Sequence, residues 1–173
     1  LNKEFAIKFD NCVPLNESCT SYFGIQAYDR KSTINIDKLD DNHLPIIDGG
    51  DINSFSYSLP TKYFNFLPEK IKSGGNFNVY NEKRIVISQI GFTPIVGICE
   101  KGILGSNTLY NINLKPNSKF HLYFLLSILN SSLIKAYWVS KYSDGKKLFP
   151  KIKGFQLKEL PIKVVAEEFQ LPF

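Results

Sequence analysis

The side chains that could do chemistry in this sequence are mostly basic groups and neutral hydrogen-bonding groups. Glutamine, asparagine, serine and threonine can bond the edges of nucleobases, and lysine and arginine can neutralise phosphates. The candidate contact residues of both kinds are Arg30, Lys31, Lys62, Arg84, Gln89, Ser106, Asn107, Thr108, Lys141, Lys146, Lys147, Lys151 and Lys153. Together they predict a surface that binds nucleic acid. The alternative interpretation of each polar residue, taken singly, is the exposed face of a half-solvated sheet.

The distribution of charge favours the same prediction. Residues 1–60 carry five Lys/Arg against nine Asp/Glu, a net charge of −4, whereas residues 61–173 carry sixteen against seven, a net charge of +9. Between residues 115 and 163, ten lysines are opposed only by Asp144 and Glu159. Because such a region attracts polyanions, we expect the loop over 141–153 to lie along a phosphate backbone. The alternative is a solvated face that only keeps the protein soluble.

Catalytic and cofactor-binding motifs are missing from the sequence. Neither G-x-G-x-x-G nor G-x-x-x-x-G-K-[ST] occurs, and His43 and His121 are the only histidines. A magnesium-dependent nuclease could use Asp144-Gly145-Lys146 or Glu82-Lys83-Arg84, but two-metal chemistry needs several converging carboxylates. We therefore expect no catalytic residue, no metal ligand and no cofactor in this chain, with a nuclease as the weakest alternative.

The cysteines and the absence of a targeting segment indicate a cytoplasmic protein. Cys12, Cys19 and Cys99 cannot all pair, and their spacing lacks the short paired knuckles of a zinc site. The start of the sequence has no signal peptide, and the most apolar run, over 122–129, is interrupted by Ser127. We expect reduced thiols and no membrane partner.

The elements that would position the candidate residues predict an α+β fold. Residues 23–57 are loop-rich with short extended pieces, and β-branched runs divided by glycine turns from Arg84 to Ile112 predict an antiparallel meander. One long helix is predicted over 119–140, capped by Ser118. A basic loop, the short helical turn FQLKEL and a final extended strand IKVV follow it. The sheet region is thus expected to be mixed or antiparallel.

The predicted long helix is apolar nearly all the way round. Leu122, Leu125, Leu126 and Leu129 begin a stripe at three- and four-residue steps, and Phe124 and further apolar residues lie off that stripe. Such a helix must be covered on more than one side. An alternative function is therefore a protein-interaction module that docks through this helix, with the lysines only solubilising it.

Length predicts a single domain, and the first residue predicts a fragment. The chain has 173 residues, begins with Leu1 and contains no methionine, so we expect a piece of a longer polypeptide. Within this domain, 1–21 would be a lead-in, 22–114 the β-rich recognition part and 118–140 the helix. Residues 141–173 would hold the basic loop, the short helix and the last strand.

The order of the segments resembles a known family. The succession YFGIQAYDR, LPIIDGGDINSF, EKRIVISQIG, TLYNINL, LLSILNSSLIKAYW and FPKIKGFQLKELPI, over 22–162, is similar to the TaqI-like C-terminal specificity domain. This is the target-recognition part of adenine-specific DNA methyltransferases and of fused restriction–modification enzymes. Its most specific pieces are ILNSSLIKAYW and FPKIKGFQLKELPI.

The resemblance implies that this chain binds double-stranded DNA and that another part of the parent reacts. In the family, a separate methyltransferase domain of the parent chain binds S-adenosylmethionine and carries an N-P-P-[YF] motif, which is missing here. Magnesium is a further candidate cofactor of the parent where the parent also cleaves DNA. The family's motifs assign no base-reading position, because recognition loops must differ between enzymes with different targets.

Overall fold

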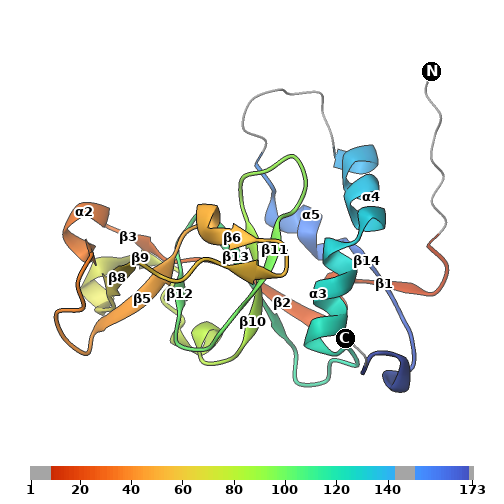
Figure 1. The fold of residues 1–173 in the computed structure, drawn as a ribbon, viewed down its shortest axis with the longest axis horizontal. Coiled ribbons are helices and arrows are strands. Elements are labelled where there is room, and N and C mark those ends of the chain that lie inside the picture. The colour runs from red at the N-terminus through yellow and green to blue at the C-terminus, as the bar shows by residue number, and fades with distance from the viewer. Residues whose placement is uncertain (1–8, 143–150, 172–173) are drawn as a thin grey trace.

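The computed structural model describes residues 9–142 and 151–171. The molecule is elongated (Figure 1): short strands and α2 (Arg30–Thr33) form one end, a four-stranded sheet forms the middle, and α3, α4 and α5 form the other end. Along the described chain, five α-helices, two of them only four residues long, are interspersed irregularly among the strands of several sheets. The predicted α+β class is confirmed.

The central sheet is antiparallel and has the strand order β11-β10-β13-β2. Its strands are β2 (Cys19–Phe23), β10 (Arg84–Ser88), β11 (Val96–Cys99) and β13 (Leu109–Leu114). The region over 84–112 is therefore antiparallel as predicted, but it is not a simple meander. Between β11 and β13 the chain leaves the sheet to form β12 (Leu104–Gly105), which pairs in parallel with a strand of the second sheet. β13 then returns on the other side of β10.

The second sheet has the order β12-β5-β8-β4 and lies next to the central one (Figure 1). Its other strands are β4 (Ile34–Asn35), β5 (His43–Ile47) and β8 (Lys62–Asn65). Three two-stranded pairs complete the strands: β1 (Cys12–Pro14) with β14 (Pro161–Lys163), β3 (Gln26–Ala27) with β9 (Ile71–Ser73), and β6 (Ile52–Asn53) with β7 (Ser56–Tyr57). Connections include α1 (Leu15–Ser18) and the 3-10 turns η1 (Gly49–Asp51), η2 (Pro68–Lys70), η3 (Phe77–Tyr80) and η4 (Glu167–Phe169).

The single helix predicted over 119–140 is wrong: the structure has two helices, α3 (Leu122–Asn130) and α4 (Ser132–Tyr142), which meet at a bend of 58°. Ser131 has extended backbone angles, φ −63° and ψ 150°, and its hydroxyl accepts a hydrogen bond from the Ile134 N–H. It therefore ends α3 and caps α4. The Asn130 amide donates to the carbonyls of Leu126 and Val96, which ties the bend to β11. The polar run Asn130-Ser131-Ser132 thus marks the break between the two helices.

The predicted turn before the last strand is present as α5 (Gly154–Lys158), which β14 follows. Within the described ranges no single helix is long and apolar enough to span a membrane; α3 and α4 meet that test by length and composition only as the bent pair. α3 is largely a core helix, since Phe124, Leu125 and Leu129 are buried, whereas α4 buries only Ile134 and Trp138.

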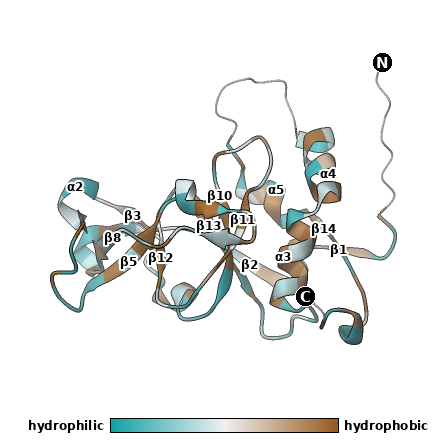
Figure 2. Ribbon diagram, in the orientation of Figure 1, coloured by the Kyte–Doolittle hydropathy of each residue, from teal (hydrophilic) through white to brown (hydrophobic). Residues whose placement is uncertain are grey.

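The hydrophobic core lies on both faces of the central sheet, and β10 is buried along its whole length. Ile85 and Ile87 pack toward the helices with Leu125 and Leu129, whereas Val86 packs on the other face with Ile47. The second sheet encloses a smaller cluster of its own around Phe64. In Figure 2, β5 and α3 are coloured as hydrophobic and α2 as largely hydrophilic. The segments with candidate contact residues are therefore loops and ends set on a buried frame.

Candidate nucleic-acid interface

Asp48 connects three segments that are distant in the sequence. It directly follows β5, and its carboxylate accepts from Arg30 Nη2 at 2.8 Å to each oxygen. Lys62 Nζ on β8 lies 3.4 Å from Oδ2, and the Ser106 hydroxyl donates to Oδ1. The Asp48 N–H in turn donates to Asp51 Oδ2 at 2.7 Å, which fixes the turn that carries the carboxylate. We call Arg30, Asp48, Lys62 and Ser106 the Asp48 node.

A one-way chain of hydrogen bonds supports this node. The Gly49 N–H donates to Thr108 Oγ1 at 2.7 Å. The hydroxyls of Thr108 and Ser106 lie 2.7 Å apart, and Ser106 gives its proton to Asp48. Since each hydroxyl has one proton, Thr108 must donate to Ser106. The chain therefore runs Gly49, Thr108, Ser106, Asp48, and it locks the β12–β13 connection onto the turn after β5.

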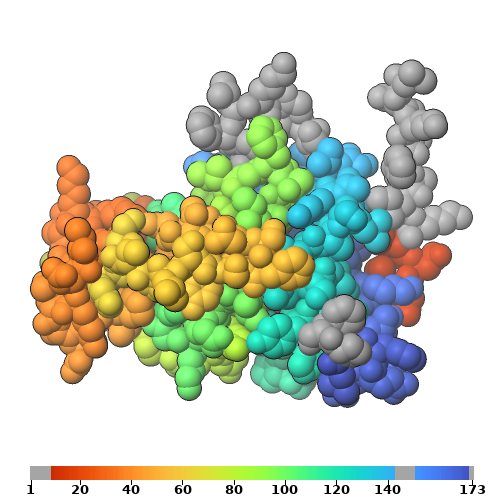
Figure 3. Space-filling model, in the orientation of Figure 1, coloured from red at the N-terminus to blue at the C-terminus, as the bar shows by residue number. Residues whose placement is uncertain are grey.

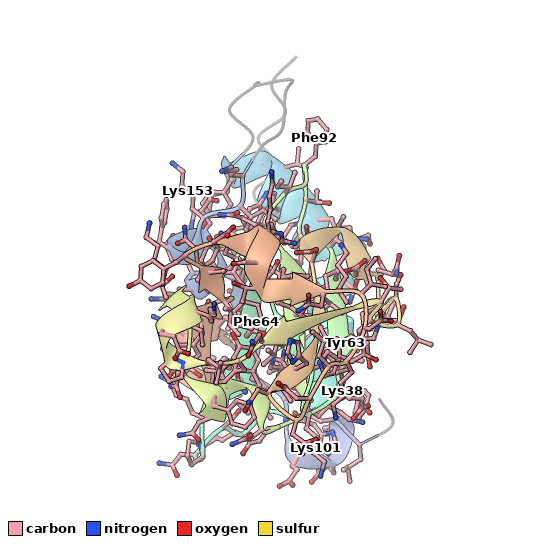
Figure 4. The ribbon with its side chains drawn as sticks, turned by 90° about the vertical axis from the view of Figure 1, so that its left-hand side faces the viewer. Lys38, Tyr63, Phe64, Phe92, Lys101 and Lys153 are labelled. Carbon is pink, nitrogen blue, oxygen red and sulfur yellow. The ribbon has the colours of Figure 1, made fainter. Side chains whose placement is uncertain are left out.

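The node borders a cleft of about 230 Å³. Gln26, Tyr28, Arg30 and Asn107 contribute its polar and aromatic rim, while buried Phe64 and other apolar residues of the small second core form its floor. Tyr28 is 69% exposed, so its ring faces solvent at this rim. Figure 4 looks onto this end of the molecule and labels Phe64 and Tyr63 in its middle. Amide, guanidinium and phenol groups thus surround a small apolar floor.

A second group of candidate residues adjoins the first through the backbone. The Gln89 N–H donates to the Thr108 carbonyl, and the Gln89 carbonyl accepts from the Ile152 N–H, both at 2.8 Å. Residues 151–153 therefore run beside the end of β10. Lys151 and Lys153 are exposed, and Lys153 Nζ lies 5.9 Å from the centre of the Phe155 ring. The candidates at 89, 106–108 and 151–153 form one connected region.

The views place this region along one side of the molecule. In Figure 1, α2, the turn η1, the connection between β10 and β11 and the segment entering α5 all lie along the upper side. The β10–β11 connection, yellow-green, stands out there in the space-filling view (Figure 3). Figure 4 shows Phe92 of this connection and Lys153 high on the molecule, with Lys38 and Lys101 low. The upper side thus carries basic, amide and exposed aromatic groups together.

Arg84 must be removed from the predicted contact residues. Its side chain is fully buried, so it cannot reach DNA. Nε donates to Asn111 Oδ1 at 2.8 Å, Nη2 to the Ile103 carbonyl at 2.6 Å, and the guanidinium lies 5.0 Å from the centre of the Tyr80 ring. Burial lowers the pKa of this guanidinium, and an arginine nevertheless stays charged at neutral pH. Arg84 is therefore a structural group that joins β10 to β13 and to the connection after β11.

The other predicted residues divide into four groups. Ser106 is fully buried, so it positions Asp48 and contacts no ligand, and the Thr108 hydroxyl is used in the same way. Lys141, on α4, is held by Tyr137 of the same helix and by Glu159, which follows α5, away from the node. Lys146, Lys147 and Asp144 lie outside the described residues. Arg30, Lys31, Lys62, Gln89, Asn107, Lys151 and Lys153 remain accessible.

The excess of lysines over residues 61–173 also predicts that these lysines converge on one face, and the described lysines contradict this prediction. Lys101 lies at the opposite edge from Lys153 in Figure 4. Lys115 donates to the Asn16 carbonyl and Lys163 to that of Asp10, both at the helical end of the molecule. Lys83 pairs with Glu100 at 2.8 Å. The upper side is therefore modestly basic, and its hydrogen-bonding groups matter as much as its charge.

Sequence reasoning missed Asp48, Gln26 and Tyr28. In the sequence Asp48 is only the residue before a glycine turn, because its partners lie 14, 18 and 58 positions away. A pairing of such long range leaves no periodic signal. The exposed aromatic Tyr28, next to Asp29 and Arg30, was the one local hint of this rim.

The protonation of Asp48 gives a pH prediction. Partial burial raises the pKa of its carboxyl, but hydrogen bonds from Ser106 and Arg30 and the nearby cations outweigh burial and hold the pKa below its ordinary value. The node therefore stabilises the fold above the unfolded pKa of about 3.9, and this contribution is lost as pH falls through the lower, folded pKa. Urea unfolding of the wild type and of Asp48→Asn from pH 7 to pH 3 should show the difference between them shrinking. A constant difference would contradict the lowered pKa.

A family model shows the family of this chain, and two solved structures show its fold. The model of the TaqI-like C-terminal specificity domain matches residues 44–162. A chain from the structure described as "Structural basis underlying complex assembly and conformational transition of the type I R-M system" superposes with a TM-score of 0.63 and 17% identity, covering 93% of this chain and 35% of that chain. The crystal structure of the HsdS subunit from Thermoanaerobacter tengcongensis gives a TM-score of 0.60 and 17% identity, covering 93% and 34%.

This chain therefore spans about one third of the length of these two structures, and a likeness at such low identity shows the fold alone. No curated protein matches the sequence.

Proposed function

Because the chain belongs to the TaqI-like C-terminal specificity domain family, we propose that it recognises a specific sequence in double-stranded DNA for a restriction–modification enzyme. The family match is the observation that carries this proposal. The matched residues, 44–162, include Asp48, Gln89, the β12–β13 connection and Lys151 to Lys153. The connected upper side described above is thus made largely of family residues, and Arg30 is added to it from outside the match.

The chemistry of the upper side suits the reading of a duplex. Lys62, Lys151 and Lys153 can contact phosphates and set the register, while the amides of Gln89 and Asn107 and the guanidinium of Arg30 can bond base edges. The protruding β10–β11 connection with exposed Phe92 can enter a groove. Phosphate contacts position the domain and a few base contacts specify the sequence.

The catalytic partner is a methyltransferase domain of the same parent chain, and its target base is adenine. One structural relative is described as part of a type I restriction–modification system and the other as an HsdS subunit, which favours a partner that modifies DNA. A methyltransferase flips its base out of the stack, so a neighbouring module must hold the flanking duplex. S-adenosylmethionine would be bound by that partner and not by this chain. A cytoplasmic location, and a single domain over residues 1–173 cut from a longer chain, stay predictions.

A salt titration tests the binding proposal. The affinity of the 173-residue chain for duplex DNA should fall on a steep slope in log Kd against log salt, because each phosphate contact releases counterions. Changing Lys146, Lys147, Lys151 and Lys153 together to alanine should weaken binding to all sequences alike and lower the slope by about 1 per lysine that contacts phosphate. The matched control is Lys38→Ala with Lys101→Ala on the opposite edge, which should leave both quantities unchanged. Equal effects of the two variants would contradict this interface.

One observation favours the alternative of a protein-docking module. A groove of about 530 Å³ lies where α3, α4 and the β1–β14 pair meet, and Ile128, Leu133, Ile134 and Pro161 are among its lining residues. A chain that only docks would show no affinity for DNA at any salt concentration. The nuclease alternative predicts magnesium-dependent cleavage that Asp144→Ala abolishes, and we expect no cleavage.

A further inference from the structure

Arg30 is held at one end of its guanidinium and open at the other. Nη2 binds both oxygens of Asp48, whereas no atom in the described part of the chain accepts a hydrogen bond from Nε or Nη1. The side chain is 49% exposed and contributes to the rim of the 230 Å³ cleft. The open donors are thus available to a ligand at this rim.

Both ends of the Arg30 side chain are fixed. Its backbone is the first residue of α2, which Asp29 caps by accepting from the Lys31 N–H at 3.0 Å. Its guanidinium is anchored on Asp48, which is only 23% exposed and is itself held by Ser106 and Asp51. A free arginine loses considerable rotamer freedom when it binds a partner. This arginine has lost most of that freedom before binding, which favours a ligand that demands a defined donor direction.

Asp48 weakens the preference of Arg30 for phosphate. Its carboxylate neutralises part of the guanidinium charge, so a phosphate at the open side is attracted less strongly than by a free arginine, although Lys62 leaves the Asp48 node with a net charge of +1. A base edge carries no net charge, so its hydrogen bonds to Arg30 lose little by this neutralisation. Guanine presents two acceptors, N7 and O6, in the major groove, and a single donor left open on Arg30, Nη1 or Nε, can bond either of them.

We propose that Arg30, positioned by Asp48, reads a guanine through its major-groove edge in the recognised sequence. The inference rests on the proposed function, because it requires that the chain bind a specific duplex. Arg30 supplies the donors, and Asp48 acts as a positioning residue that contacts only protein. The Asn107 amide lies on the same rim and donates to no described atom, so the rim also has a free group for a neighbouring base edge.

The test begins with selection of the preferred sequence by the 173-residue chain from randomised duplexes. Each guanine of that sequence is then replaced singly, either by 7-deazaguanine, which lacks the N7 acceptor, or by inosine, which keeps N7 and O6 and lacks only the minor-groove amine. We expect one guanine at which 7-deazaguanine weakens binding about tenfold and inosine has no comparable effect. In Arg30→Lys, which keeps the charge but not the fork, that 7-deazaguanine penalty should disappear while the salt slope stays unchanged.

Asp48→Asn and Lys31→Ala separate positioning from charge. Asn can still accept one bond from Arg30 Nη2 but lacks the second acceptor oxygen and the negative charge, so discrimination at the same guanine should fall about tenfold with no loss of affinity for random duplex. Lys31→Ala removes an exposed cation next to Arg30, so it should weaken binding to all duplexes alike and leave the discrimination at this guanine intact. The fluorescence of the single tryptophan, the buried Trp138, reports whether each variant is folded.

The outcomes distinguish the inference from the function on which it rests. A wild-type chain that prefers no sequence overturns both. A chain that prefers a sequence, but whose 7-deazaguanine penalties are the same in the Arg30→Lys variant as in the wild type, overturns the inference and leaves the proposed function standing. The modified bases are also tested on the wild-type chain, so the inference can be overturned even where a variant fails to fold. A wild-type chain that shows no 7-deazaguanine penalty at any guanine overturns it.

Discussion

Arg84→Ala is expected to lower the free energy of unfolding by about 3 to 5 kcal/mol, although the sequence predicts Arg84 to be a surface residue. The change leaves a cavity in a fully buried site at the start of β10. It also removes the donors to Asn111 Oδ1 and to the carbonyls of Ile103 and Glu100. A buried acceptor without a partner costs its full desolvation free energy, so these losses add to that of the cavity.

Urea unfolding followed by Trp138 fluorescence measures this effect. The matched control is Lys83→Ala, one residue earlier, where the exposed side chain pairs only with surface groups; we expect nearly unchanged stability there. Arg84→Lys should lie between the wild type and Arg84→Ala, because it keeps the cation but cannot reproduce the fork of donors. Equal midpoints for Arg84→Ala and Lys83→Ala would mean that the buried network contributes nothing.

The prediction failed at Arg84 because burial of a charged residue depends on groups that the sequence does not place. Lysine and arginine are almost never fully buried without partners, and the run Lys83-Arg84 before Ile85 is typical of a strand that begins at the surface. The partners are an asparagine on β13 and carbonyls after β11, and none of them is a carboxylate. No pattern of complementary charge was therefore available to indicate the site.

Elements with strong local signals could be predicted, and those that depend on tertiary pairing could not. The β-branched residues of RIVIS predicted the strand that is β10, and the segment after Gly154 predicted the short helical turn that is α5. The apolar stripe over 122–138 indicated helix, but the choice between one helix and two was made by Ser131 and Asn130 through bonds to the next turn and to β11. The excursion of β12 to the second sheet involves two residues, too few for a periodic signal.

The candidate site shows the same division. Residue types were sufficient to select Arg30, Lys62, Ser106 and Thr108, and the structure brings these four together. Their roles could not be inferred from residue type, because the hydroxyls of Ser106 and Thr108 form hydrogen bonds inside the protein that hold Asp48 in place. Asp48 is the centre of the group, yet an aspartate before two glycines is equally typical of an ordinary turn. Chemistry selected the candidates, and only packing assigned their roles.

Gly49→Ala is expected to lower the free energy of unfolding by about 2 to 3 kcal/mol, because the two turns that form the site are in direct contact at Gly49. A Cβ atom at this position would lie 2.4 Å from the Thr108 carbonyl oxygen, and the obstacle is backbone and cannot rotate away. The turn must then move off the β12–β13 connection and lose the bond from the Gly49 N–H to Thr108 Oγ1. Since that bond begins the chain that holds Asp48, discrimination between DNA sequences should fall with stability.

Gly50→Ala provides the matched control at the adjacent position. A Cβ atom there meets no atom within 4 Å, and the backbone does not have a positive φ, so alanine fits without strain. We expect stability equal to the wild type or slightly higher, because alanine restricts the unfolded chain more than glycine does. Urea midpoints and binding of both variants to selected and random duplexes measure the contrast. If the adjacent glycines tolerate alanine equally, the turns do not pack as described, and Asp48 lacks the rigid support that its proposed role in reading guanine requires.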